Sequence, residues 1–191
     1  MKTPEEIFRF KAEYYSLLFQ IAAKCGLVDQ NTFDIQNHYF DDKYKTSHDV
    51  RYNSPFETMF KWLALYEDYP CVYRWELIPP YDECEIKEVI NGLRDASNLN
   101  MPYVDMAATT TTNTLYVGKA EGCVWGRQIE HLGYHKKAQT HHGLHIHDWA
   151  QQRGLSFKLH VFVFPKECTP ILELFEYALA KEYKPLIGSH K

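Results

Sequence analysis

The chain has 191 residues, of which 45% are hydrophobic, 15% aromatic and 24% charged. Its 14 Tyr, 11 Phe and 4 Trp exclude intrinsic disorder, and no apolar run approaches the ~18–20 residues that a membrane span needs. A net charge of −4 by itself argues against a nucleic-acid partner. Residues 110–191, however, hold 10 Lys+Arg against 7 Asp+Glu, or +3, so a site for a polyanion is expected in the second half.

The first third of the sequence predicts two helices joined by an irregular segment. A capping box formed by Thr3 and Glu6 begins an apolar pattern of helical spacing, which predicts a helix over about 4–25. Residues 29–53 are polar and rich in Asp and Asn, so we expect loop or irregular structure there. A second capping signature predicts a helix from about 54 to 68.

The remaining sequence predicts a compact mixture of strands and helices. The expected elements are a strand over 71–78, a helix over 83–95, a strand over 114–118, helices over 124–134 and 144–152, a strand over 157–164 and a helix over 170–183. Strands and helices in this order favour an α+β fold, in which helices flank a small, mostly antiparallel sheet. The expected division is a helical N-terminal extension, 1–68, and a domain over 69–191.

Cysteine usage and the N-terminus favour a reducing location. The five Cys are an odd number without a CxxC pair, which argues against a disulfide framework. The first residues are acidic and polar, whereas a secretory signal begins with a basic and then an apolar run. We therefore expect a cytoplasmic protein without a membrane partner.

Six side chains in the predicted domain form an acid–base set for phosphodiester cleavage. Arg127 and His131 are four residues apart and therefore share one face of their helix. Cleavage needs a base for water, an oxygen-ligated cation and positive charge for the developing oxyanion. The candidate residues are Tyr73, Tyr116, Lys119, Arg127, His131 and Glu176.

Four motifs in order give the chain a resemblance to the GIY-YIG nuclease family over roughly residues 70–190. They are Cys71-Val72-Tyr73-Arg74, then Leu115-Tyr116-Val117-Gly118-Lys119-Ala120, then Arg127 with His131, and finally Glu176 followed by Pro185-Leu186-Ile187-Gly188. The two tyrosine motifs are most similar to the N-terminal nuclease domain of the bacterial excision-repair incision subunit. The Arg-x3-His pair and the late Glu look more like homing and restriction endonucleases of the family.

The resemblance implies a GIY-YIG-like fold and an endonuclease that hydrolyses DNA, most simply double-stranded DNA, with one Mg²⁺ or Mn²⁺ ion. It implies that one of the two motif tyrosines, aided by a neighbouring base or a metal-bound water, takes the proton from the attacking water. We favour Tyr116 as this base, because the positive charge of the adjacent Lys119 would favour its phenolate. Arg127 would brace the scissile phosphate, since its planar fork matches phosphate oxygens. Glu176 would hold the metal ion, and His131 would support a phosphate or the base tyrosine.

The chain departs from the family pattern in three places. Tyr73 and Tyr116 are 43 residues apart, so either an insertion over 79–113 separates their strands or Tyr103 is the first-motif tyrosine. Val72 replaces the glycine of the first motif, and Gly188 stands where the family usually has Asn. Loss of that Asn side chain leaves open a weak or inactive nuclease-like module that binds nucleic acid or a protein.

Two further readings remain open. His131 and His135 have the spacing of zinc ligands on a helix, which would suit a zinc-dependent hydrolase. Either His135 or His142 could instead be a second histidine of the nuclease site. The N-terminal extension could form a homodimer interface, cover the sheet or contact the substrate.

Overall fold

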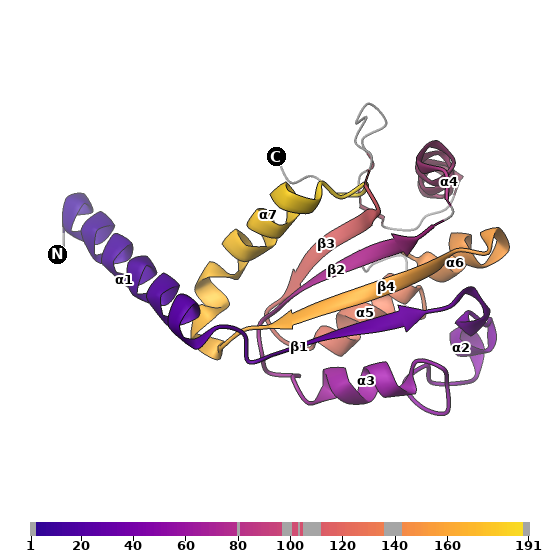
Figure 1. The fold of residues 1–191 in the computed structure, drawn as a ribbon, viewed down its shortest axis with the longest axis horizontal. Coiled ribbons are helices and arrows are strands. Elements are labelled where there is room, and N and C mark those ends of the chain that lie inside the picture. Colours follow the sequence, from indigo (N-terminus) through magenta and orange to yellow (C-terminus); the bar gives the residue numbers. More distant parts are fainter. Residues whose placement is uncertain are drawn as a thin grey trace.

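The protein is described here by a computed structural model, which covers residues 3–79, 81–96, 101–102, 104, 112–135 and 143–188. Within these residues the fold is α+β, as the sequence predicts, and it contains a four-stranded antiparallel sheet (Figure 1). The strands are β1 (Asp29–Ile35), β2 (Cys71–Ile78), β3 (Thr114–Ala120) and β4 (Ser156–Val163). The α-helices are α1 (Pro4–Cys25), α2 (Lys43–Thr46), α3 (Glu57–Ala64), α4 (Glu83–Ala96), α5 (Val124–Leu132), α6 (Ile146–Ala150) and α7 (Leu172–Tyr183).

The strand order is β1-β4-β2-β3, so β2 and β4 are central and β3 is an edge strand. Side chains alternate between the two faces of β2. Val72 packs with Val117 of β3 and with Leu172 of α7, whereas Tyr73 and Trp75 belong to the large core on the other face. Helix α7 therefore covers one face of the sheet, and α3 and α5 lie on the opposite side (Figure 1).

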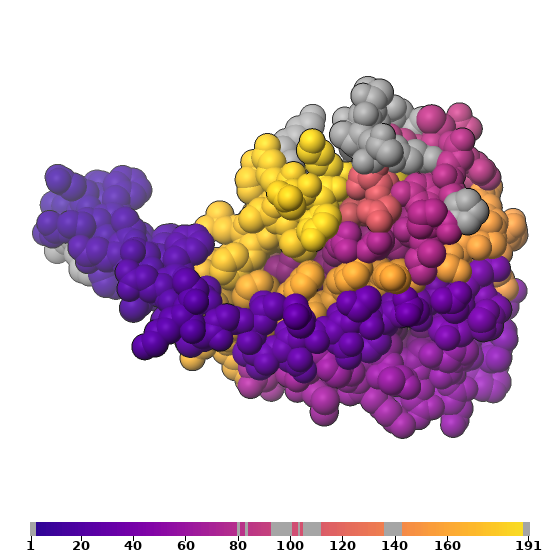
Figure 2. Space-filling model, viewed as in Figure 1, coloured from indigo at the N-terminus to yellow at the C-terminus, as the bar shows by residue number. Residues whose placement is uncertain are grey.

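Helix α1 begins and ends where the sequence predicts. The Thr3 side chain accepts a hydrogen bond from the Glu6 backbone N–H, and the Glu6 side chain accepts one from the Thr3 backbone N–H. Gly26 ends the helix with φ 65°, a conformation that favours glycine. Only the C-terminal part of α1 packs on the body, and the rest projects away from it (Figures 1 and 2).

The prediction of irregular structure over 29–53 is wrong for its first part. Strand β1 occupies Asp29–Ile35 and pairs along its whole length with β4, from Asp29 opposite Val163 to Ile35 opposite Phe157. Its polar side chains are exposed or half-buried and only Ile35 is fully buried, as expected for an edge strand. Helix α2 and a short 3-10 turn at Asn37–Tyr39 follow it.

Residues 29–64 share the sheet and the main core with the rest of the chain. Strand β1 extends the sheet, and Phe56, Phe60 and Leu63 belong to the same buried cluster as Tyr73 and Leu132. The boundary expected at residue 68 thus lies between two elements of one core.

The segment between β2 and β3 contains α4, which agrees with the expected helix over 83–95. Tyr103, the alternative first-motif tyrosine, lies outside the described residues. Among the described residues, no helix is both long enough and apolar enough to cross a membrane.

Candidate functional site

The pairing of β2 with β3 brings the two motif tyrosines to one face of the sheet. Tyr73 lies opposite Gly118, and Trp75 lies opposite Tyr116. Because alternate residues of a strand share a face, Tyr73 and Tyr116 are diagonal neighbours, and their ring centroids are 6.4 Å apart. Tyr73 is fully buried, whereas Tyr116 is only partly buried.

Gly118 makes room for both rings. A Cβ atom at this position would lie 2.6 Å from the Tyr73 hydroxyl oxygen and 2.6 Å from Cε1 of Tyr116. Real Cβ atoms almost never approach other atoms this closely. The glycine two residues after Tyr116 is therefore required because both tyrosine rings lie across it.

Helix α5 places His131 against Tyr73. The His131 Nε2 atom is 2.8 Å from the Tyr73 hydroxyl oxygen, and the backbone N–H of Leu144 donates to His131 Nδ1 at 3.3 Å. A neutral imidazole has one donor and one acceptor nitrogen. Since Nδ1 accepts from Leu144, Nε2 carries the proton and donates it to Tyr73, which fixes the tautomer of His131.

Arg127 lies one turn earlier on the same helix. Its Nε–H donates to the Tyr73 hydroxyl oxygen at 3.4 Å, and its Nη1 donates to the Glu130 carboxylate at 2.5 Å. The Tyr73 oxygen therefore accepts two hydrogen bonds, one from Arg127 and one from His131. The spacing of Arg127 and His131 predicts a shared helix face, and the structure places both side chains against Tyr73.

The pKa values of both tyrosines are raised. Burial raises the pKa of Tyr73 well above its ordinary range, and the nearby Tyr116 adds to this shift. Burial also raises the pKa of Tyr116, and the Arg127 charge opposes that shift. The expectation that Lys119 favours the Tyr116 phenolate is not met, because the cation that lowers this pKa is Arg127.

Lys119 and Glu176 approach the site from the other face of the sheet. Lys119 is three residues from Tyr116 on the same strand, which directs it to the α7 face, where it lies 3.5 Å from the Glu121 carboxylate. Glu176 of α7 is half-buried. Its charge interacts with Lys119 and Arg127 and raises the pKa values of Tyr73 and Tyr116. The two groups of residues thus meet around β3, an edge strand of the sheet.

Glu176 fits the role of ligand to a hard divalent cation. Burial raises the pKa of its carboxyl group, and among the described residues this carboxylate forms no hydrogen bond or ion pair. Mg²⁺ is often held by one or two carboxylates together with water and substrate phosphates. A half-buried carboxylate near the positive charges of Lys119 and Arg127 could serve as one such ligand.

The other histidine roles are not supported by the described residues. Both ring nitrogens of His131 are occupied, and no group of three His, Cys, Asp or Glu among the described residues could hold a metal ion. His142 lies outside the described residues. His135 lines two cavities beside α5.

The C-terminal motif runs beside β3. The backbone N–H groups of Leu186 and Ile187 donate to Thr114 and Leu115 at 2.9 and 3.0 Å. Gly188 has φ 108°, in the region that favours glycine over Asn or any other side chain. This backbone conformation gives a physical reason for Gly188 at the position where the GIY-YIG family usually has Asn.

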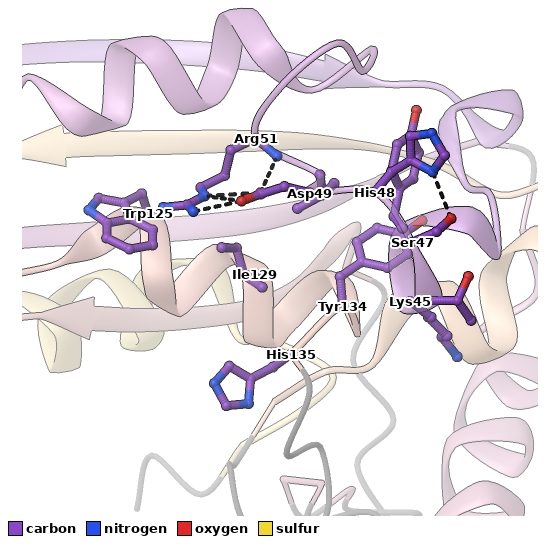
Figure 3. Close-up of a pocket in the computed structure, with 12 residues that line it drawn as sticks. Lys45, Ser47, His48, Asp49, Arg51, Trp125, Ile129, Tyr134 and His135 are labelled. Carbon is purple, nitrogen blue, oxygen red and sulfur yellow. Dashed lines mark hydrogen bonds and ion pairs between the residues drawn. The ribbon is translucent and has the colours of Figure 1, made fainter.

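Sequence reasoning missed a cavity of about 630 Å³ between residues 44–51 and α5 (Figure 3). It is lined by Trp125 and Ile129 of α5 and by cationic and aromatic side chains of the earlier segment. Nothing in the sequence indicated that this segment returns to α5, because the contact joins residues about 75 positions apart.

Comparison of the chain with protein-family models, curated proteins and solved structures found no match.

Proposed function

We propose that the protein is a metal-dependent endonuclease of the GIY-YIG type that hydrolyses phosphodiester bonds in DNA. The observation that carries the proposal is the Tyr73 hydroxyl oxygen, which accepts hydrogen bonds from Arg127 and His131 beside the second motif tyrosine. The motif order and the free Glu176 carboxylate add support.

In this proposal Tyr116 is the general base and Tyr73 is a positioning residue. Tyr116 is partly exposed and can be reached by water, whereas Tyr73 is fully buried and holds Arg127 and His131 in place. Arg127 stabilises the charge that develops on the scissile phosphate. A divalent cation bound by Glu176 would supply further positive charge and lower the pKa of a bound water.

A catalytically weak module that binds nucleic acid or protein is the second candidate. The raised pKa of Tyr116 favours it, since a phenol that stays protonated near neutral pH is a poor base. The two candidates differ in one respect: the module would bind DNA and leave it intact with every metal.

Cleavage of supercoiled plasmid and of single-stranded DNA, with Mg²⁺ or Mn²⁺, tests the proposal. The wild type should cut, and Glu176→Gln should lower the rate at least a hundredfold while its thermal unfolding stays close to that of the wild type. Glu182→Gln is the matched control, because Glu182 is an exposed carboxylate on the same helix. Equal cutting by wild type and Glu176→Gln would contradict the site, and no cutting by the folded wild type would favour the binding module.

We also propose a homodimer formed through α1. Several large apolar side chains of this helix are exposed, among them Ile7 (45%), Phe8 (73%) and Leu17 (53%). At its C-terminal end the apolar face packs on the body, where Leu18 is buried against Cys168 and Ile171. Exposed apolar side chains continue along the projecting part of the helix, and exposed apolar surface of this kind marks interfaces.

A second copy suits this face because an antiparallel pair of α1 helices is self-complementary. The first turn carries Glu5 and Glu6 and the last turn carries Lys24, so opposite charges would meet at both ends. Exposed aromatic and aliphatic side chains of this size offer roughly 100 Å² each, so the face approaches the ~800 Å² per partner of a stable interface.

The five cysteines are free thiols. This supports a reducing, cytoplasmic setting as part of the proposal.

A further inference from the structure

The cavity beside α5 is large enough for a ligand and has a mixed lining. Its volume is about 630 Å³, within the ~300–1,000 Å³ of typical ligand pockets. One wall is α5, with Trp125 and Ile129, and the other is the segment from Tyr44 to Arg51 (Figure 3). Tyr134 and His135 close it at the end of the helix.

This cavity adjoins a second one that reaches two residues of the candidate catalytic site. A second cavity of about 440 Å³ is lined by Lys119, Arg127 and Glu130, and it shares Trp125, Ile129 and His135 with the first. The two cavities therefore lie side by side along α5.

The lining has the chemistry that recognises a nucleotide. The Arg51 guanidinium lies 4.8 Å from the centroid of the Trp125 ring, and Asp49 fixes it with two bonds from Nε and one of 2.6 Å from Nη2. Lys45 and His48 also line the cavity; Lys45 is ion-paired with Asp148, and His48 Nδ1 is 2.8 Å from the Ser47 hydroxyl oxygen. Aromatic rings that stack on bases, combined with cations along the backbone, are typical of sites for single-stranded nucleic acid.

We propose that this cavity binds an unpaired nucleotide of the substrate DNA, and that this nucleotide adjoins the phosphate that Arg127 braces. The substrate class is therefore DNA with a single-stranded segment at the cleavage position. This inference rests on the proposed function. The base stacks against Trp125, next to the Arg51 guanidinium. A base within a duplex is stacked on both sides and cannot enter a recess between two protein walls.

Binding of a fluorescein-labelled oligothymidylate, measured by anisotropy in EDTA so that no cleavage occurs, tests the proposal. Trp125→Ala should weaken binding roughly 5- to 150-fold, the range for loss of one stacked base, and Trp125→Phe should retain most of the affinity. Trp62→Ala is the matched control, because Trp62 packs against Phe33 and Tyr66, outside the cavity. Affinity for a blunt, fully paired duplex should be unchanged by Trp125→Ala.

Photocrosslinking locates the bound base. A single 5-iodouracil is moved along the oligonucleotide, and mass spectrometry should find the crosslink at Trp125 for one position, adjacent to the cleaved bond. Crosslinks spread over many positions, or equal losses for single-stranded and duplex DNA with Trp125→Ala, would overturn the proposal.

The remaining outcomes separate this inference from the proposed function. Cleavage that depends on Glu176, together with unchanged binding by Trp125→Ala, overturns the nucleotide site and leaves the endonuclease intact. Binding that depends on Trp125 without cleavage rejects the endonuclease and supports the cavity as a DNA site. If free thymidine monophosphate binds through Trp125 and the oligonucleotide does not, the cavity serves a free nucleotide and the proposal fails.

Discussion

In the candidate site, Gly118 is the position with the least room for a larger side chain. Its missing side chain lets Tyr73 and Tyr116 lie across the strand pair, and both rings are held by packing and by hydrogen bonds. A buried ring cannot move aside without disturbing the helix that packs on it. The geometry of both tyrosines therefore depends on a residue that has no chemical role.

Gly118→Ala is expected to lower cleavage at least tenfold, because the added methyl group displaces the Tyr73 hydroxyl group or the Tyr116 ring. It should also cost about 1–3 kcal/mol of unfolding free energy, as overpacking usually does. The measurements are plasmid cleavage and urea denaturation. Gly92→Ala is the control. A Cβ atom added at this position has no neighbour within 4 Å, and removal of a helical glycine should stabilise the fold. Full activity of Gly118→Ala would contradict the described packing.

The pH dependence of cleavage follows from the raised pKa values of Glu176 and Tyr116. The metal ligand and the base both act in their deprotonated forms, so activity should fall as the pH drops through the Glu176 pKa, which lies above the ordinary Glu value. Because the Tyr116 pKa is raised above 10, activity should still be rising with pH at pH 9. Rates between pH 5 and 9.5 measure this, with exposed Tyr177→Phe as control for Tyr116→Phe. A rate that is flat from pH 6 to 9 would exclude Tyr116 as base.

Among the elements, α5 supplies Arg127 and His131, and their spacing in the sequence made this predictable. Arg127 and His131 could be assigned to one helix face, and strands β2 and β3 could be read from apolar alternation. Strand β1 could not, because an edge strand with polar outer positions has the composition of a loop. Lys119 was placed beside Tyr116 from proximity in sequence, although alternation along the strand directs it to the other face.

Long-range contacts account for what else the sequence did not show. The Leu144 backbone that fixes the His131 tautomer, and the segment over 44–51 that encloses the α5 cavity, are brought in by packing alone. Neither has a local pattern. The residues of the candidate site could therefore be named from the sequence, whereas their hydrogen bonds and the adjoining cavity could not.

The hydrogen bond from the Leu144 backbone to His131 of α5 can be tested by substitution of His131. His131→Ala removes a donor to Tyr73 and the acceptor of the Leu144 N–H, so it should reduce cleavage more than tenfold and cost about 1–3 kcal/mol of stability. His131→Gln retains an N–H donor and should recover part of the activity. Cleavage assays and thermal unfolding report the two effects. Equal activity of wild type and His131→Ala would remove His131 from the proposed mechanism.

At the scale of the whole molecule, the projecting α1 helix predicts the oligomeric state. Light scattering coupled to size exclusion should give twice the 22.5 kDa chain mass for the wild type. Ile7→Glu with Phe8→Glu should give a monomer, because two charges would be buried in the apolar interface. Ser16→Glu, on the polar side of the helix, should remain dimeric. A monomeric wild type at micromolar concentration would contradict the homodimer.

The strand order has a consequence for synthesis on the ribosome. Strand β1 is bonded only to β4, and Ile35 and the paired Phe157 are separated by about 120 positions. At a translation rate of roughly 5–20 residues per second, roughly 6–25 s pass between the synthesis of β1 and the synthesis of β4. Strands β2 and β3 can meet earlier, since they pair directly. We therefore expect nascent chains that end before β4 to remain without a closed sheet, with Phe33 and Ile35 accessible to chaperones until the last quarter of the chain has been translated.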